Sequence, residues 1–308
     1  MTVAVAPVPP LPGRPRGAIG RFVRHVPALV SLIVILALVA GAVFAPAVAS
    51  LLGIDPLAED LFNQYQPPSA AHWLGTDALG RDVLVRLLYA GRVSLLVGFA
   101  GALIASLIGT LVGIAAGYYG GRVDAVLMRI TDAAIALPVL PLLIILAAVD
   151  LGKIGLPESF VRSGQAGVWR IVVIVALFGW TTAARLVRAS ALAVREREFV
   201  RAARALGASD LRIMATHILP NILSPLVVAT TLAVGSVVLV ESVLSYLGLG
   251  INPPTPSWGG MLQNAQQTVS RAPWLAIFPG IAIFATVLAF NFLGDGLQDA
   301  LNPRRTRR

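Results

Sequence analysis

Six apolar stretches, each close to the length needed to cross a lipid bilayer, constrain the fold of this chain more than any other feature. An α-helix rises 1.5 Å per residue, so roughly 20 mainly apolar residues cross the ~30 Å hydrocarbon core. The chain has 308 residues, of which 57% are hydrophobic and 13% charged, so it has too few polar side chains to cover a soluble domain. We therefore predict an all-α, polytopic membrane protein with about six transmembrane helices. The predicted spans are residues 28–49, 94–116, 133–149, 168–184, 222–246 and 275–293.

The distribution of basic residues predicts the orientation of these spans. Lys and Arg are retained on the cytoplasmic side of a membrane protein. If the N-terminus is cytoplasmic, seventeen of the 24 basic residues lie inside, including the seven between Arg185 and Arg212. The first external loop instead carries Asp55, Glu59 and Asp60. We expect a multi-pass membrane protein with both termini in the cytoplasm.

The two ends of the chain are predicted to lie outside the membrane. Five prolines precede residue 16, and proline prevents a regular helix, so residues 1–26 form a disordered or interfacial cytoplasmic arm. A cleaved signal peptide ending at the Ala47-Val48-Ala49 pattern is the alternative, but the apolar run before it is longer than the usual 7 to 15 residues or so. Residues 27–298 form the transmembrane domain, and residues 299–308 form a basic cytoplasmic tail.

The residue inventory argues against several other classes of protein. The chain has no cysteine, so it has no disulfide, no thiolate nucleophile and no Cys-ligated metal. Its net charge of +9 comes from residues between apolar runs, which predicts no nucleic-acid partner. His25, His72 and His217 lie in separate regions, so we predict no catalytic residues and no metal site. The single lysine, Lys153, is not part of a P-loop pattern, so the chain cannot bind ATP in that way. If its function is powered by ATP, the nucleotide site must be on a partner.

The segment between the predicted fourth and fifth spans is the most informative part of the sequence. Residues 196–206 favour a short amphipathic helix, Gly207 supplies the left-handed conformation that ends it, and Ser209 or Asp210 caps a second helix over 211–219. The apolar face of the first helix is thin, which favours docking against another protein surface over deep burial. The residues at helical spacing on this face are Phe199, Ala202, Ala203 and Leu206.

This segment resembles the EAA loop of binding-protein-dependent ABC permeases. Arg201-Ala-Ala-x-x-x-Gly207, nine further residues and then His217-x-Leu219-Pro220 match its spacing, with Arg201 where Glu is usual and His217 where Ile is usual. The resemblance implies the type I ABC importer permease fold in the bacterial inner membrane, with this segment seated in a groove of an ATPase. On spacing alone, an ordinary amphipathic loop is the alternative. The coupling residues that the resemblance implies are Glu198, Arg201, Ala202, Ala203, Gly207, Ala208, His217, Leu219 and Pro220.

Two further motifs resemble the dipeptide, oligopeptide and nickel branch of these permeases, and most of all the C-type subunit of the peptide importers. They are Leu74 to Asp82 followed by Gly91 to Leu95, and Leu244 to Gly250 followed by a proline-rich stretch ending in Trp258-Gly259. The resemblance implies a non-enzymatic chain that moves di- or oligopeptides inward and binds no cofactor itself. ATP and Mg would lie on two ABC ATPase subunits, and the other partners would be a second homologous permease, an extracytoplasmic solute-binding protein and membrane lipid. Nickel or another small solute is the alternative substrate.

Glu241 is the only clear acidic candidate in the predicted spans. An ion-coupled secondary transporter ordinarily needs ionisable sites near the membrane midplane, so this mechanism is the weaker alternative. Glu241, Ser242 and Ser245 lie within one helical turn, where they are candidates to line the translocation path. In the competing interpretation, the buried glutamate is satisfied by neighbouring helices or by the outer cap of the fold.

Overall fold

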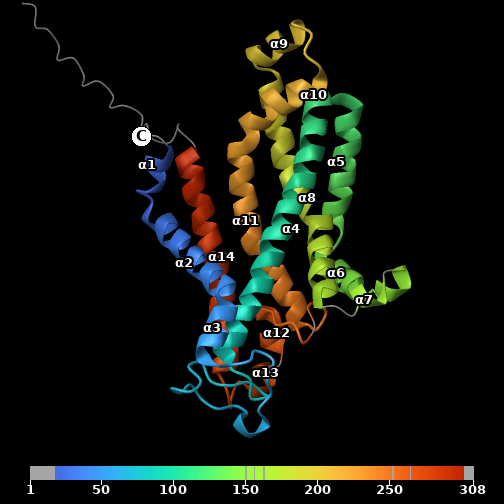
Figure 1. Cartoon of the computed structure of the whole chain (residues 1–308). Coiled ribbons are helices and arrows are strands. Elements are labelled where there is room, and N and C mark those ends of the chain that lie inside the picture. The colour runs from blue at the N-terminus through green and yellow to red at the C-terminus, as the bar shows by residue number, and fades with distance from the viewer. Residues whose placement is uncertain are drawn as a thin grey trace, which may run out of the picture.

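Long helices running side by side form the molecule in this computed structural model (Figure 1). The structure describes residues 18–149, 151–155, 157–161, 164–251, 253–263 and 265–301. Within these residues the only β-pairing is an isolated bridge between Thr76 and Asp82, so the predicted all-α fold is confirmed. Most of the predicted N-terminal arm and most of the predicted basic tail lie outside the described residues.

Among the residues that the structure describes, five helices are long and apolar enough to cross a membrane, and a bent pair of helices is a sixth candidate. The pair, α5 (Gly121–Ala136) and α6 (Val139–Ala147), bends by 87° and counts as one span only if both halves are taken together. This agrees with the prediction of about six spans. The five long helices are α2 (Val26–Val43), α4 (Val83–Tyr119), α8 (Gly164–Arg195), α11 (Leu219–Tyr246) and α14 (Trp274–Leu301).

Two of the predicted spans, 28–49 and 133–149, are interrupted in the structure, and each break lies next to a proline. α2 ends before Phe44, and the chain continues as α3 (Ala45–Leu52) with Pro46 in its first turn, where a missing N–H is tolerated. α5 ends before Leu137, whose backbone is extended (φ −71°, ψ 136°) because the following Pro138 disfavours the helical conformation.

Short helices occupy the two ends of the bundle. α9 and α10 lie at one end, together with α1 and the last residues of α14, whereas α3, α12 and α13 lie at the other (Figure 1). We call these the α9 end and the α12 end.

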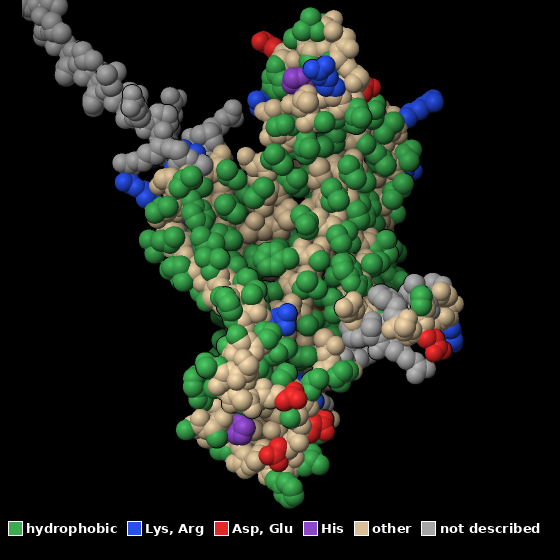
Figure 2. All heavy atoms as spheres, viewed as in Figure 1, with side chains coloured by type: hydrophobic (Ala, Val, Ile, Leu, Met, Phe, Trp, Pro, Cys, Tyr) green, Lys and Arg blue, Asp and Glu red, His purple; other side chains and the backbone are tan. Residues whose placement is uncertain are grey.

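Apolar side chains cover the middle of the visible face, and most of its charged side chains lie towards the two ends (Figure 2). The short elements are α1 (Ala18–Phe22), η1 (Leu61–Asn63), η2 (Leu151–Ile154), α7 (Glu158–Val161), α9 (Glu198–Ala205), α10 (Asp210–Ile213), η3 (Met214–Ile218), α12 (Trp258–Gln263) and α13 (Ala265–Thr268).

Glycines on α4 bring it into close contact with α8, and this is the most extensive helix pairing among the described residues. Gly109, Gly113 and Gly117 lie four residues apart on one side of α4. A Cβ at Gly109 would lie 2.5 Å from the Trp180 carbonyl oxygen, and one at Gly113 would lie 2.6 Å from that of Ala184. Small residues at such spacing allow two membrane helices to approach closely. The pairing holds the α9 end of α8 against that of α4.

Candidate functional site

The predicted tight corner follows α9. Gly207 has a φ of +81°, which confirms the left-handed conformation expected there. The Ala208 N–H donates to the Ala203 carbonyl (3.1 Å), and the Gly207 N–H donates to that of Arg204 (3.0 Å). These two bonds form a Schellman motif, in which the residue after the glycine contacts the one five positions earlier. Ala203 and Ala208 both pack against the same apolar cluster, which is a structural reason for their small side chains.

The inner side of the corner packs on the bundle through a face other than the predicted one. Val200, which the predicted face omits, is fully buried, whereas Phe199, Ala202 and Leu206 are exposed. Of the four residues on the predicted face, only Ala203 joins the apolar cluster. The rotation of α9 about its axis is set by the ends of α4, α8 and α11, which helical periodicity alone cannot identify. The buried members of this cluster are Ile114, Tyr118, Val187, Ala191, Val194, Val200, Ile213, Ile218 and Ile222.

The outer side of the corner presents large apolar side chains to the surroundings. Leu206 is 88% exposed, Leu211 is 75% exposed and Phe199 is 40% exposed. α9 itself carries Glu198, Arg201 and Arg204, so this surface combines apolar and charged groups. Neighbouring exposed apolar residues rimmed by polar ones are characteristic of protein–protein contact sites. The corner therefore has a buried side that is fixed to the bundle and an exposed side available to a partner.

Polar contacts fix the corner to the end of α4. Arg195 Nη1 donates to the carbonyl oxygens of Gly117 (3.1 Å) and Tyr118 (3.2 Å), which lie in the last turn of that helix. The Tyr118 hydroxyl donates to Asp210 Oδ1 (2.6 Å), and the Arg204 guanidinium lies 5.3 Å from the Tyr118 ring centre. The hydrogen bond to Tyr118 holds the pKa of Arg204 above its usual value, so Arg204 remains a cation. One aromatic side chain thus links α4 to both helices of the corner.

The second helix of the corner continues directly into α11, whereas the predicted second helix covers only residues 211–219. The π-helical turn η3 joins α10 to α11, and Pro220 lies in the first turn of α11. The run is not broken at Pro220, although a proline cannot donate to the preceding turn. Just before it, η3 has the wider pairing of a π-helix, in which the Leu219 N–H donates to the Met214 carbonyl five residues earlier. His217 lies in η3 with its ring centre 6.1 Å from that of Phe199, and its carbonyl accepts a hydrogen bond from Asn221 Nδ2 (2.7 Å).

The predicted coupling residues lie together at the α9 end, on both sides of the corner. Glu198, Arg201, Ala202, Gly207 and Pro220 are exposed or partly exposed. The remaining predicted residues are partly buried on the inner side of the segment. These are Ala203, Ala208, His217 and Leu219.

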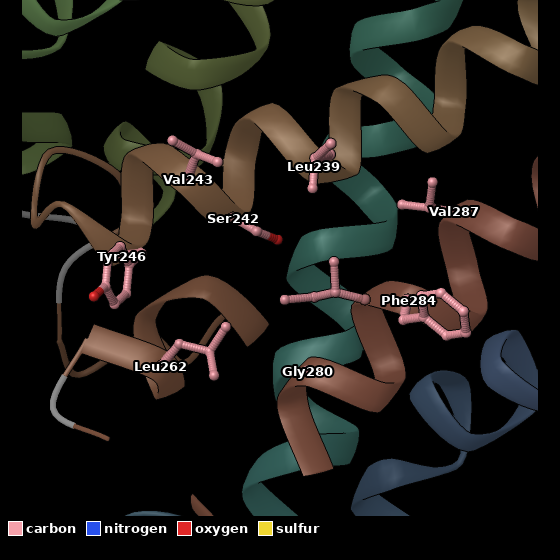
Figure 3. A pocket seen from close by; sticks show the side chains of 9 residues that line it. Leu239, Ser242, Val243, Tyr246, Leu262, Gly280, Phe284 and Val287 are labelled. Atoms are coloured by element: carbon pink, nitrogen blue, oxygen red, sulfur yellow. The ribbon is translucent and has the colours of Figure 1, made fainter. Parts of the chain in front are cut away.

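Glu241 lies far from this site, on α11 near the α12 end, and it is fully buried. Its carboxylate accepts hydrogen bonds from the hydroxyls of Ser94 on α4 (2.9 Å) and Ser245 (2.7 Å). Of the two interpretations of the sequence, the geometry supports a glutamate satisfied by neighbouring elements. Ser242 lines an apolar groove of about 450 Å³ between α11, α12 and α14 (Figure 3), whereas Glu241 and Ser245 are not among the residues that line it.

Two ion pairs between α5 and α8 were not predicted from the sequence. Arg188 Nη2 donates to Asp124 Oδ2 (2.6 Å), and Arg185 Nη2 donates to Asp132 Oδ1 (2.6 Å). The only indication of these ion pairs in the sequence is that acidic residues lie next to one predicted span and basic residues next to the following one. It does not identify the partners, because residues 64 and 53 positions apart become neighbours only when the helices pack.

The long apolar helices define a multi-pass membrane protein, and the partly exposed helical corner lies at one end of its bundle. Residues 109–307 match the family described as binding-protein-dependent transport system inner membrane component, and residues 16–68 match the N-terminal TM domain of oligopeptide transport permease C. The chain belongs to the family of binding-protein-dependent transport system inner membrane components. It is a permease subunit of an ABC importer, as the resemblance of residues 201–220 implied.

Several curated relatives are similar to the chain over most of its length. It is 42% identical over 279 residues to a dipeptide transport system permease protein of Alkalihalophilus pseudofirmus, covering 90% of this chain and 86% of the relative. It is 37% identical over 289 residues to an oligopeptide transport system permease protein of Bacillus subtilis, covering 94% and 89%. It is 44% identical over 237 residues to a glutathione transport system permease protein of Pectobacterium atrosepticum, covering 77% and 74%.

Proposed function

We propose that this chain is one of two homologous permease subunits that carry di- or oligopeptides into the bacterial cell, with ATP hydrolysed on partner subunits. The observation that carries the choice of substrate is the set of relatives, which are named for dipeptides, oligopeptides and glutathione. Glutathione is itself a tripeptide, so short peptides are the class that these names share. An extracytoplasmic solute-binding protein would deliver the peptide, and two ABC ATPase subunits would bind ATP and Mg.

We propose further that the α9–α10 corner is where an ATPase subunit binds. Leu206 and Leu211 are available to a partner, whereas Val200 fixes the other side of α9 to the bundle. A force on the exposed side would therefore act on the ends of α4, α8 and α11 together, because all three contribute to the same buried cluster. Packed helices respond to such a force by moving as a rigid body.

The same proposal places the α9 end in the cytoplasm. The excess of basic residues between Arg185 and Arg212 lies at this end, as expected for a cytoplasmic segment. The first and last described helices meet there as well, because Arg21 Nε and Nη2 donate to the Ala300 carbonyl oxygen (3.0 and 2.7 Å). Both termini would then be cytoplasmic.

Uptake of labelled peptides by a bacterial strain that lacks only this chain tests the substrate and the energy source. We expect loss of di- or tripeptide uptake, recovery with the wild-type gene, and loss again when the partner ATPases are deleted. We also expect the purified chain alone to hydrolyse no ATP. Unchanged peptide uptake together with lost nickel accumulation would overturn the peptide assignment. Transport by the isolated chain, driven by an ion gradient, would overturn the ATP-driven mechanism.

A further inference from the structure

A short segment covers the outer ends of α4 and α11 and lies directly on their backbones. We call residues 250–260, apart from residue 252, the outer cap segment. A Cβ at Gly259 would lie 2.5 Å from the Ser242 Cα, and one at Gly250 would lie 2.5 Å from the Ser245 Cα. Trp258 is 2% exposed, and its indole N–H donates to the Leu87 carbonyl on α4 (3.1 Å). The segment is therefore in close contact with both helices.

Two serine hydroxyls connect the Glu241 carboxylate to this segment. Ser245 Oγ donates to Glu241 Oε1 (2.7 Å) and accepts from the Ile251 N–H (3.2 Å). Ser94 Oγ donates to Glu241 Oε2 (2.9 Å) and accepts from the Trp258 N–H (3.1 Å). Each carboxylate oxygen thus reaches one backbone N–H of the outer cap segment through one hydroxyl. Ser94 comes from α4 and Ser245 from α11, so the network includes both helices.

Ser94 and Ser245 can both donate to residue 241 only if its side chain accepts a hydrogen bond at each of its two terminal atoms. A serine hydroxyl has one proton, so a serine that accepts from a backbone N–H must direct its own proton elsewhere. Glu241 accepts that proton from both serines. A glutamine side chain accepts on its oxygen but donates on its nitrogen. The serine next to the glutamine nitrogen would then face two donors, that nitrogen and a backbone N–H. Its own hydroxyl proton would lose its buried acceptor.

We propose that Glu241 is a positioning residue that fixes the outer cap segment to α4 and α11, so that the segment moves with these helices during transport. α11 runs without interruption for 28 residues from the α9–α10 corner past Glu241, so it connects the two ends of the molecule. Displacement of the corner would therefore reach the outer cap segment through the carboxylate and its two serines. This inference does not depend on which solute is transported.

Thiol labelling measures directly whether the segment stays in place, because the native chain has no cysteine. Ile251 is 4% exposed at the start of the segment, and Ala265, in α13 outside the network, is 2% exposed. We would place Ile251→Cys or Ala265→Cys in the full chain, assembled with its partners in membrane vesicles. The reaction rate with a membrane-impermeant maleimide would then be compared with and without Glu241→Gln.

We expect Glu241→Gln to accelerate labelling at Ile251→Cys by roughly tenfold or more, and to leave labelling at Ala265→Cys unchanged. Ser245→Ala, which keeps the carboxylate, should also accelerate labelling at Ile251→Cys. Glu241→Asp, which keeps two accepting oxygens, should restore part of the protection. The matched control is Ser106→Ala on α4, which removes a buried hydroxyl outside the network and should change nothing.

A second measurement separates positioning from general stability. In the assembled transporter, Glu241→Gln should lower solute uptake by a larger factor than it lowers ATP hydrolysis, because the corner remains intact. Equal labelling rates in all variants would overturn the proposal. Acceleration at both Ile251→Cys and Ala265→Cys would also overturn it, because that result indicates loss of the whole outer region.

Discussion

Gly207 has a backbone conformation that residues with a side chain disfavour, and the space around it is open. Its φ is +81°, and no neighbouring atom lies within 4 Å of the position that a Cβ would take. A substitution there is therefore opposed by the backbone alone, by about 1–2 kcal/mol. Because that strain acts on the corner itself, the geometry of the corner can be changed with little effect on the packing of the bundle.

We predict that Gly207→Val lowers solute uptake severely while the chain still inserts into the membrane. Gly207→Asn should keep more activity, because asparagine tolerates the left-handed conformation. Gly53 provides a matched control, since it has a φ of +67°, open surroundings and the same pair of backbone bonds at the end of α3. Gly53→Val should retain uptake. Normal uptake by Gly207→Val, or equal losses at the two positions, would show that the corner has no special role.

Exposed leucines at the corner can be tested without disturbing the fold. Leu206 is 88% exposed, so Leu206→Ser should change the stability of the chain by less than about 0.5 kcal/mol. If the ATPase subunit covers this side chain, the substitution should weaken the free energy of binding between the ATPase subunit and the chain by about 1–3 kcal/mol. Co-purification of the ATPase subunits with the detergent-extracted chain measures this loss. Leu51→Ser at the α12 end, where the leucine is 86% exposed, is the control and should co-purify normally.

At the scale of helices, the pairing of α4 with α8 depends on glycines that leave no room for a side chain. A Cβ at Gly113 would lie 2.6 Å from the Ala184 carbonyl oxygen and 2.7 Å from the Val187 Cβ. Such crowding can be relieved only by moving the backbones apart. The corner would move as well, because the end of α8 contributes Val187, Ala191 and Val194 to the cluster beneath it.

We predict that Gly113→Ala destabilises the chain by about 1–3 kcal/mol, because it overpacks a close helix contact. Gly280→Ala is the matched control, since Gly280 lies within α14 and a Cβ added there would have no neighbouring atom within 4 Å. That change should leave the stability unchanged or raise it by up to about 1 kcal/mol, because alanine favours a helix more than glycine does. Thermal unfolding of the two variants in the same detergent gives the comparison. Equal melting temperatures would contradict the packing argument.

Sequence periodicity identified the helices well and their detailed shape less well. Hydrophobic length is a local property, so the long spans were found, and spacing alone placed the left-handed glycine at residue 207. The buried face of α9 and the partners of Glu241 depend on residues far along the chain. Ser94, for example, lies 147 positions from Glu241. For the same reason, the sequence left two interpretations of Glu241 open, and the serine from α4 that donates to its carboxylate is identified only by the packing of α4 on α11.

At the scale of the whole molecule, the cysteine-free sequence makes the orientation testable. Phe62 is 98% exposed in η1, which directly follows a residue whose N–H donates to the Leu79 carbonyl just before α4, and Leu206 is 88% exposed after α9. We predict that an impermeant maleimide added to intact cells whose outer membrane has been permeabilised labels Phe62→Cys and not Leu206→Cys. Inverted inner-membrane vesicles should give the opposite pattern. The reverse result in both preparations would place the α9 end outside the cytoplasm.

The contact between Arg21 and the Ala300 carbonyl has a consequence for biosynthesis. The donor is made among the first residues and the acceptor near the last described residue, 279 positions later. A ribosome adds roughly 5–20 residues per second, so the Ala300 carbonyl is made on the order of tens of seconds after Arg21. Throughout that interval the later spans insert in turn. The contact between the first and last described helices can therefore form only after residue 300 has been made.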